Sequence, residues 1–196
     1  MSLSIFYTPD GHRRFAEEER ISIASSYRTG VNVLVEEIIE PTIGRFSIKR
    51  MDIFCLSNRN LFNRDTGELD DWLSVGIEML NGVVERCSRF ANVKTVGNFL
   101  DKNISVIHSP ESPTVRFFIG NSIEDTEDIE PVDLFIRSGG QLRLSGAPRA
   151  LLGDNTELCS IPTLHPRIRF DEICKVLDVY GSRYFRHSDN NPSRSV

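Results

Sequence analysis

Two arginines and a serine follow a largely apolar run late in the sequence, in a pattern suited to anion binding. The run is Val132–Ile136, and Arg137, Arg143 and Ser145 follow it around a Gly-Gly pair. Such a run is typical of a buried parallel strand, and ligands of parallel sheets bind beyond the carboxyl ends of the strands. Guanidinium groups match phosphate oxygens, and glycines let the backbone approach a ligand. The segment predicts a phosphate site, although a strand followed by a Gly-Gly turn and a capped helix is also an ordinary structural feature.

A second segment near the start of the chain has the same chemical character. Asp10 and Gly11 follow a short apolar strand at 4–8, and Arg13 and Arg14 then open a polar helical run. The start of a helix offers unpaired N–H groups and positive dipole charge to a phosphate, and an aspartate there can hold a metal ion on it. An Asp-Gly pair alone is more often a plain turn. The prediction therefore depends on the two segments together.

Taken together, the segments resemble the signatures of the cis-prenyltransferases, the undecaprenyl diphosphate synthase family. That family has Asp-Gly-Asn-x-Arg-Trp after its first strand and a late Asp-Leu-x-Ile-Arg-x-Gly-Gly-x-x-Arg-x-Ser segment, which correspond here to Asp10–Phe15 and Asp133–Ser145. The stretch Phe54–Arg64 is similar to the family's Phe-Ser-x-Glu-Asn-Trp-x-Arg segment with one residue inserted. Glu157 matches the glutamate of its Ala-Glu-Leu-Tyr segment, and Arg183–Phe185 matches its closing Arg-Arg-Phe. The resemblance covers nearly the whole chain.

The resemblance implies a fold and an activity. The fold would be α/β, a single domain at 1–187 with a mainly parallel central sheet flanked by helices, followed by a disordered polar tail at 188–196. The activity would be that of a prenyltransferase that condenses an allylic diphosphate with a second C5 isoprenyl diphosphate. The resemblance further implies Mg²⁺ as cofactor and a homodimer.

The resemblance also implies roles for individual residues. The allylic diphosphate would rest on the helix start after Gly11, and the second, non-ionising diphosphate on the arginines of the late segment. Asp10 would hold Mg²⁺, with Glu157 as a second metal ligand. The candidate catalytic residues are Asp10, His12 and Asn60. The candidate substrate-binding residues are Gly11, Arg13, Arg14, Phe15, Tyr27, Arg28, Arg64, Arg137, Arg143 and Ser145.

Several positions depart from the family pattern. Ile23 stands where the family has an arginine, Tyr27 where it has a histidine, and His12 where it has an asparagine. The allylic site would thus lack two cationic hydrogen-bond donors. A bulky residue and two arginines after Asp-Gly, together with tyrosine for histidine, resemble the small branch that performs irregular head-to-middle couplings, such as cyclolavandulyl diphosphate synthase.

The spacing of two strands bears on the length of the product. Only the twelve residues Gly120–Pro131 join the strand ending at Ile119 to the strand starting at Val132, which leaves room for one short helix. Family members have a longer helical insertion here and another before it, both bordering the tunnel for the prenyl chain. With less wall, and with Trp72 and Met79 able to close its side, we expect a product of ten or fifteen carbons.

Two alternatives to a short-chain synthase remain open. A regular cis-polyprenyl synthase of the undecaprenyl type would share every motif. A non-catalytic partner subunit of such an enzyme is favoured by the lost charges at Ile23 and Tyr27, whereas the retained Asp10, Arg137 and Arg143 argue against it.

Apolar periodicity predicts the elements that must position these residues. The expected strands lie near 4–8, 51–56, 93–97, 114–119, 132–137 and 157–161. Besides the helical run after Gly11, the expected helices lie near 24–40, 67–90 and 170–183.

Composition excludes several other classes of protein. A formal net charge of −5 without a basic stripe argues against a nucleic-acid partner. The four cysteines are far apart and form no Cys-x-x-Cys motif, so free thiols in a reducing compartment are expected. Neither a signal peptide nor a long apolar run is present, and we expect a cytoplasmic protein without a transmembrane segment.

Two further groups of polar residues do not predict metal sites. The acidic run Glu124–Asp128 is expected to be a solvated turn or short helix, because the metal motifs of trans-prenyltransferases work in pairs inside a helical bundle. His108, His165 and His187 show no ligand spacing with one another or with cysteine, which makes a zinc site improbable.

Overall fold

A seven-stranded sheet forms the centre of the molecule. The computed structural model describes residues 2–57, 66–97, 104–125, 129–144 and 146–188. The strand order is β4-β3-β5-β2-β1-β6-β7; every adjacent pair is parallel except β3 and β4, which are antiparallel. The strands are β1 (Leu3–Thr8), β2 (Ile48–Ser57), β3 (Asn92–Val96), β4 (Ser105–Val106), β5 (Thr114–Asn121), β6 (Val132–Arg137) and β7 (Leu152–Ser160). The predicted α/β fold with a mainly parallel sheet is confirmed.

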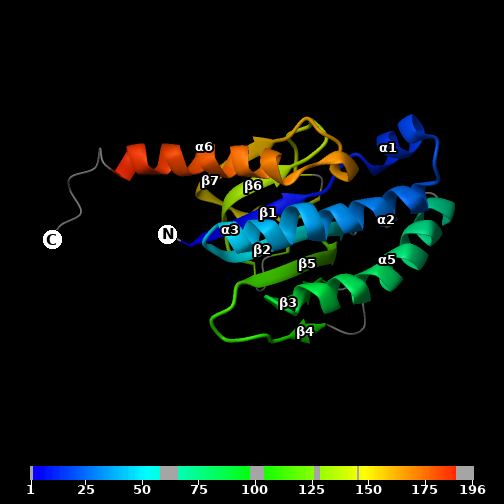
Figure 1. Cartoon of the computed structure of the whole chain (residues 1–196), viewed down its shortest axis with the longest axis horizontal. Coiled ribbons are helices and arrows are strands. Elements are labelled where there is room, and N and C mark those ends of the chain that lie inside the picture. Colours follow the sequence, from blue (N-terminus) through cyan, green and yellow to red (C-terminus); the bar gives the residue numbers. More distant parts are fainter. Residues whose placement is uncertain (1, 58–65, 98–103, 126–128, 145, 189–196) are drawn as a thin grey trace.

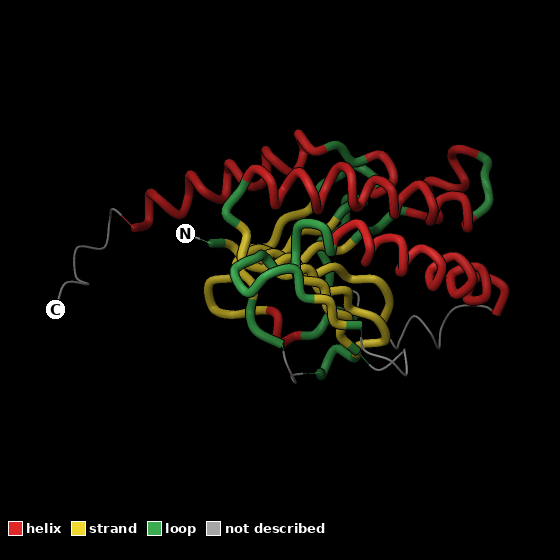
Figure 2. The backbone as a smooth tube through the Cα atoms, turned by 60° about the horizontal axis from the view of Figure 1, so that its bottom comes forward, coloured by secondary structure: helices red, strands yellow, loops and turns green. Residues whose placement is uncertain are grey.

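The two faces of the sheet are covered differently. Figure 1 shows the long helices lying along the sheet, and Figure 2 shows them gathered on one side of the strands with loops on the other. The α-helices are α1 (His12–Glu19), α2 (Ile23–Val33), α3 (Glu40–Arg45), α5 (Thr66–Cys87) and α6 (Phe170–Ser188). A π-helix η1 (Leu34–Ile39) and two 3₁₀ turns, η2 (Arg149–Leu151) and η3 (His165–Arg167), complete the described helical elements.

Strand alternation produces a separate core on each face. Ile5 and Tyr7 of β1 point toward the helices and join the larger core cluster. Phe6, between them, points to the other face, where its ring stacks on Phe135 at 5.1 Å and meets Phe118 edge-on at 5.4 Å. The strands are thus buried on both sides, which explains their nearly continuous apolar sequences.

The helix predicted at 24–40 is longer in the structure. The segments α2, η1 and α3 follow one another without a break from Ile23 to Arg45. Pro41, near the start of α3, lacks the N–H that an α-helix would use, and the wider π turn just before it relieves the clash of its ring with the preceding turn. Within η1, the buried residues are Leu34, Val35, Ile38 and Ile39, which form its core face.

The strand predicted at 157–161 begins earlier than expected. β7 starts at Leu152, because residues with low strand propensity, including Gly153, are accommodated by an irregular register. Val132 pairs with Leu152, yet Leu134 pairs with Glu157, and the Thr156 hydroxyl donates to the Val132 carbonyl at 2.5 Å. Glu157 therefore lies within a strand.

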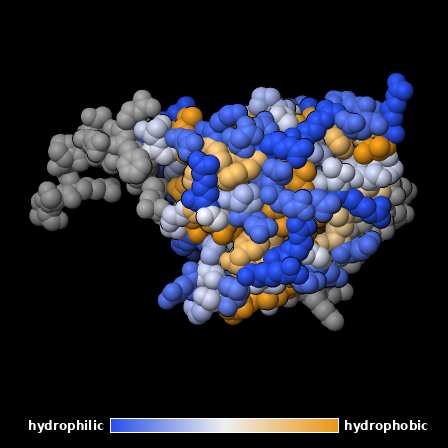
Figure 3. All heavy atoms as spheres, viewed as in Figure 1, coloured by the Kyte–Doolittle hydropathy of each residue, from blue (hydrophilic) through white to orange (hydrophobic). Residues whose placement is uncertain are grey.

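The remaining expectations can be compared with the structure. The described part of the acidic run is a turn, in which Asp125 accepts a hydrogen bond from the Ser122 N–H at 2.8 Å. None of the helices in the described ranges combines the length and apolar character needed to cross a membrane. On the face shown in Figure 3, hydrophilic residues cover most of the surface around small hydrophobic patches. The four cysteines, Cys55, Cys87, Cys159 and Cys174, are free thiols.

Candidate active site

The two predicted phosphate segments meet at the carboxyl edge of the sheet. β1 and β6 are parallel neighbours, and Thr8 pairs with Arg137, so both strands end at the same level. The Arg137 guanidinium donates through Nη2 to Asp10 Oδ2 at 2.6 Å, across 127 residues of sequence. The acid and the arginine that the sequence placed in separate segments thus form one ion pair.

A serine fixes the turn that carries Asp10. The Asp10 N–H donates to Ser138 Oγ at 2.7 Å, and the Ser138 hydroxyl lies 3.1 Å from the Asp10 carbonyl oxygen. The next residue, Gly11, has φ +110°, and a Cβ built there would lie 2.8 Å from Leu164 Cδ2. The turn therefore requires glycine at this position and delivers the chain directly into α1.

Burial makes Asp10 the natural partner of Arg137. The Arg137 side chain is 3% exposed and that of Asp10 28% exposed. A buried guanidinium needs a carboxylate or several acceptors to offset the loss of water. Arg137 Nη1 also donates to the Arg143 backbone carbonyl at 2.7 Å, so one guanidinium joins the Asp10 turn to the loop after β6.

The other predicted cationic residues lie around this pair. Arg14 is exposed and donates through Nη2 to the Gly139 carbonyl at 2.9 Å, which links α1 to the Gly-Gly turn. Arg13 on α1, Arg28 on α2 and Arg143 on the loop are exposed as well. The described site thus has Arg13, Arg14, Arg28 and Arg143 at the surface around an ion pair of the buried Arg137 with the partly exposed Asp10.

Phe15 lies in a different environment from these arginines. Its ring is buried, and the Arg167 guanidinium lies 5.1 Å from the ring centroid. Arg167 also pairs with Glu18 and Glu19 at the end of α1. Phe15 and Arg167 therefore fasten α1 to η3.

His12 and Tyr27 lie side by side between α1 and α2. Their ring centroids are 4.8 Å apart. His12 Nδ1 lies 3.3 Å from the Ser26 carbonyl oxygen, which can only accept, so this contact orients the imidazole with a proton on Nδ1. An imidazole is thus present next to position 27, where the resemblance expects a histidine.

His165 belongs to the same cluster, although no role was predicted for it from the sequence. The Tyr7 hydroxyl lies 2.8 Å from His165 Nδ1, and Nε2 lies 2.8 Å from the Gly30 carbonyl oxygen. Burial, with a smaller contribution from His12, holds the pKa of His165 well below its usual value of 6.5. The ring is therefore neutral, with Nε2–H donating to Gly30 and Nδ1 accepting from Tyr7.

Glu157 is not brought to Asp10. It pairs with Leu134, three residues before the Ser160 that pairs with Arg137, a displacement of about 10 Å along the strand. Its carboxylate lies 3.4 Å from Arg183 of α6. Within the described residues there is no group of three or more potential metal ligands. Asp10 alone still suits Mg²⁺, which commonly binds one or two carboxylates and completes its shell with phosphate oxygens and water.

Comparisons with known proteins bear on the fold. No family model and no curated protein sequence matches the chain. A solved lavandulyl diphosphate synthase from Lavandula x intermedia, in complex with dimethylallyl diphosphate, superposes with a TM-score of 0.73 at 20% identity, covering 90% of this chain and 94% of that one. A probable undecaprenyl diphosphate synthase from Campylobacter jejuni gives a TM-score of 0.68 at 15% identity, covering 92% and 95%.

The chain has the fold of these diphosphate synthases. The fold expected from the sequence motifs is thereby confirmed. Three of the predicted site residues, Asn60, Arg64 and Ser145, lie outside the described residues, as does the side chain of Trp72. The roles of the site residues remain predictions.

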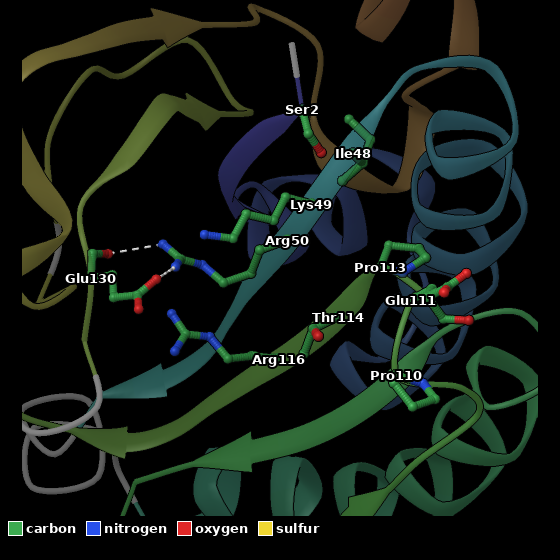
Figure 4. A pocket seen from close by; sticks show the side chains of 11 residues that line it. Ser2, Ile48, Lys49, Arg50, Pro110, Glu111, Pro113, Thr114, Arg116 and Glu130 are labelled. Atoms are coloured by element: carbon green, nitrogen blue, oxygen red, sulfur yellow. Dashed lines mark hydrogen bonds and ion pairs between the residues drawn. The ribbon is translucent and has the colours of Figure 1, made fainter.

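A pocket of about 460 Å³ lies at the opposite, amino-terminal edge of the sheet (Figure 4). Arg50 and Arg116 line it, and both pair with the fully buried Asp52, at 3.0 and 2.7 Å. Arg50 also donates to the Glu130 carboxylate and to the carbonyl oxygens of Glu130 and Pro131. These contacts hold the chain entering β6, so Arg50 supports the fold on this side.

Proposed function

We propose that this chain is a prenyltransferase that condenses an allylic diphosphate with a second C5 isoprenyl diphosphate and releases a prenyl diphosphate of ten or fifteen carbons. The observation that carries the proposal is the ion pair of Asp10 and Arg137 at 2.6 Å. It brings the two phosphate segments together at the carboxyl edge of a parallel sheet, where ligands of such folds bind. The structural similarity to two diphosphate synthases supports the same activity.

The start of α1 is the proposed seat of the allylic diphosphate. Its first-turn N–H groups and dipole favour an anion, and Arg13 and Arg14 add positive charge within the same turn. Breaking the allylic carbon–oxygen bond leaves negative charge on the departing diphosphate, so charge held at this position favours the transition state. Asp10 would hold Mg²⁺ here; when bound, the ion neutralises the leaving group.

The loop after β6 is the proposed seat of the second diphosphate. Arg137 faces it from the strand end, and the exposed residues Gln141, Leu142 and Arg143 form its outer part. Arg137 donates to the Asp10 carboxylate, so a diphosphate bound there would share this guanidinium with Asp10. Holding both substrates at one sheet edge makes carbon–carbon bond formation effectively unimolecular.

Packing between the helices and the sheet supports a short product. A long prenyl chain would run between α2, η1 and α5, but the far end of this space is filled by buried side chains. Met79 lies nearer the site on α5 and is partly buried. The residues that fill the far end are Val33, Leu34, Val35, Ile38, Ile39, Val83, Val84 and Cys87.

For the coupling chemistry, we propose dimethylallyl diphosphate as the allylic substrate and a head-to-middle bond. The lavandulyl diphosphate synthase that shares the fold was solved with dimethylallyl diphosphate. The departures at Ile23 and Tyr27, with His12 beside Tyr27, support the same branch of the family. The homodimer predicted from the resemblance remains part of the proposal, and sedimentation velocity tests it.

A product assay decides between the candidate activities. The protein is incubated with Mg²⁺ and dimethylallyl diphosphate alone, then with isopentenyl diphosphate, and then with geranyl and isopentenyl diphosphates, and the products are identified by mass spectrometry. We expect ten- or fifteen-carbon diphosphates. Chains well beyond fifteen carbons would instead identify a regular polyprenyl synthase, and no product from any mixture would favour a non-catalytic partner subunit.

A further inference from the structure

His165 is a buried imidazole that no step of the proposed reaction uses. It is 1% exposed and sits in η3, away from solvent. Nevertheless, it contacts the Asp10 turn, α1 and α2, which carry the residues predicted to bind the allylic diphosphate. Its backbone N–H donates to the Asp10 carbonyl at 2.9 Å, and its ring centroid lies 5.2 Å from that of His12.

Two hydrogen bonds fix the orientation of this imidazole. Tyr7 of β1 holds Nδ1 and the Gly30 carbonyl of α2 holds Nε2, both at 2.8 Å. The sheet and the long helix thus form hydrogen bonds with opposite edges of the ring. A side chain restrained at both nitrogens is a rigid surface for whatever packs against its face.

Gly30 provides the space that the two imidazoles occupy. A Cβ built on Gly30 would overlap His12 Cε1 and would lie 3.1 Å from His165 Cδ2. Glycine inside a helix costs about 0.5–1 kcal/mol relative to alanine. The helix carries glycine at the one turn where His12 and His165 approach its backbone.

We propose that His165 and Gly30 are positioning residues that set the orientation of the His12 imidazole beneath the Asp10 turn. Tyr27 at 4.8 Å, His165 at 5.2 Å and the backbone of Gly30 enclose the ring, and the Ser26 carbonyl orients its Nδ1. The inference rests on the proposed function, because it takes His12 as one of the candidate catalytic residues of that reaction. Accurate placement of such a group depends on supporting residues whose own orientation is locked.

A double-mutant cycle separates positioning from general support of the fold. His165→Phe keeps an aromatic ring at this position but removes both hydrogen bonds. If His165 acts through His12, His165→Phe should lower kcat about tenfold while KM for both diphosphates changes less than about twofold. In a His12→Ala background, the same substitution should change kcat less than about twofold. Equal losses of kcat in both backgrounds would overturn the proposal.

A second variant changes the contact between α2 and the His12 ring. Gly30→Ala places a methyl group against His12, whereas Gly44→Ala, in the same continuous helix, meets nothing within 4 Å and serves as the matched control. We expect Gly30→Ala to lower kcat about tenfold and Gly44→Ala to leave kcat unchanged. Gly30→Ala should also lower the Tm, and adding His12→Ala should restore it, because the overlapping imidazole is gone. Normal kcat in Gly30→Ala would contradict the proposal.

A spectroscopic readout keeps the inference separate from the proposed activity. If the unmodified protein makes no product, the proposed function fails, and the imidazole carbon–proton spectrum then tests the positioning alone. Gly30→Ala should shift the His12 ring resonances, while those of His108, an exposed histidine held by the Ser88 carbonyl at 3.0 Å, should stay in place. Unchanged His12 resonances would overturn the inference without reference to activity.

Discussion

Tyr7 and Thr8 are consecutive residues of β1, yet they belong to two very different networks. Tyr7 points to the helix-covered face, where its hydroxyl, the His165 ring and the Gly30 carbonyl are mutually satisfied. Thr8 points to the loop-covered face beside Arg137 and Ser160, its neighbours across the strands. Within the described residues, the buried hydroxyls of Thr8 and Ser160 have no hydrogen-bond partner.

The difference indicates that the two faces of the sheet have different roles at this edge. On the helix-covered face, the polar groups of Tyr7, His165 and Gly30 hydrogen-bond one another, which favours a fixed geometry. On the loop-covered face, Arg137 is paired with a partly exposed carboxylate, and the buried hydroxyls of Thr8 and Ser160 are not used by the described protein groups. We interpret the first network as the support of the site and the second as the part that responds to substrate.

Removal of Asp10 is expected to have the largest effect. Asp10→Ala and the milder Asp10→Asn should abolish turnover, because the carboxylate that would hold Mg²⁺ on the leaving diphosphate is lost. Asp10→Asn keeps an oxygen acceptor for Arg137, so the protein should still fold. Product formation by mass spectrometry and the circular dichroism spectrum test the two statements, and near-normal turnover would rule out the metal role of Asp10.

Truncation of the late arginines should weaken only one substrate. Arg137→Ala or Arg143→Ala should reduce binding of the second, non-ionising diphosphate by about 2–5 kcal/mol, as is typical when one partner is removed from a charge pair that binding buries. Arg143→Ala is the cleaner variant, since the hydrogen bond that Arg143 accepts from Arg137 uses its backbone carbonyl, which the substitution keeps. Titration calorimetry with each substrate separately is the measurement. Equal losses for both substrates would show that the two sites are not distinct.

The helix-covered network should make the protein sensitive to acid. Because the pKa of His165 is lowered in the fold, the unfolded chain takes up a proton at higher pH than the folded chain does. The stabilisation is therefore complete above the unfolded value of 6.5 and is lost as the pH falls below it, at up to about 1.4 kcal/mol per pH unit.

Denaturant unfolding between pH 7.5 and 5 checks this sign. His165→Phe should flatten the acid limb of the stability curve, although it lowers stability at neutral pH, because the Tyr7 hydroxyl and Gly30 carbonyl lose their partner. His108→Asn provides the control at an exposed histidine. An acid limb of the same steepness in His165→Phe would assign the sensitivity to other groups.

The smallest expected effect concerns product length. Met79→Ala should shift the product distribution toward longer chains, because it removes bulk from α5 on the side of the proposed prenyl cavity. Glu78→Ala, an exposed neighbour, should leave the distribution unchanged. The ratio of fifteen- to ten-carbon product, measured by mass spectrometry, tests the difference. An unchanged ratio in Met79→Ala would remove that residue from the cavity wall.

The loop-covered face was the more predictable of the two. Both phosphate segments were predicted to follow apolar strands, at 4–8 and 132–137, and parallel strands end at one edge of a sheet. The direct pairing of Asp10 with Arg137 was not predicted. The helix-covered network could not be found this way. His165 lies 158 residues from Tyr7 and 135 from Gly30, and neither partner carries a motif that indicates it.

The predicted element boundaries were wrong where local interactions competed with the apolar periodicity of the sequence. β7 extends back through Gly153 to Leu152, because the Thr156 hydroxyl accepts from the Gly153 N–H and donates to the Val132 carbonyl, which holds an irregular stretch in the sheet. The long helix continues past Pro41, a residue that normally ends helices, because the π turn accommodates its ring. Neither compensation has a signature in the sequence.

The π turn η1 also determines the direction in which the residues of α2 face. A π turn amounts to one extra residue inserted in an α-helix, and each residue of an α-helix advances the chain by about 100°. Deleting one residue within Leu34–Ile39 would restore α-helical winding and turn the preceding segment by that angle relative to α3. Tyr27 and Gly30 would then face away from His12, so the alignment of these three residues depends on a single inserted residue in the following turns of the same helix.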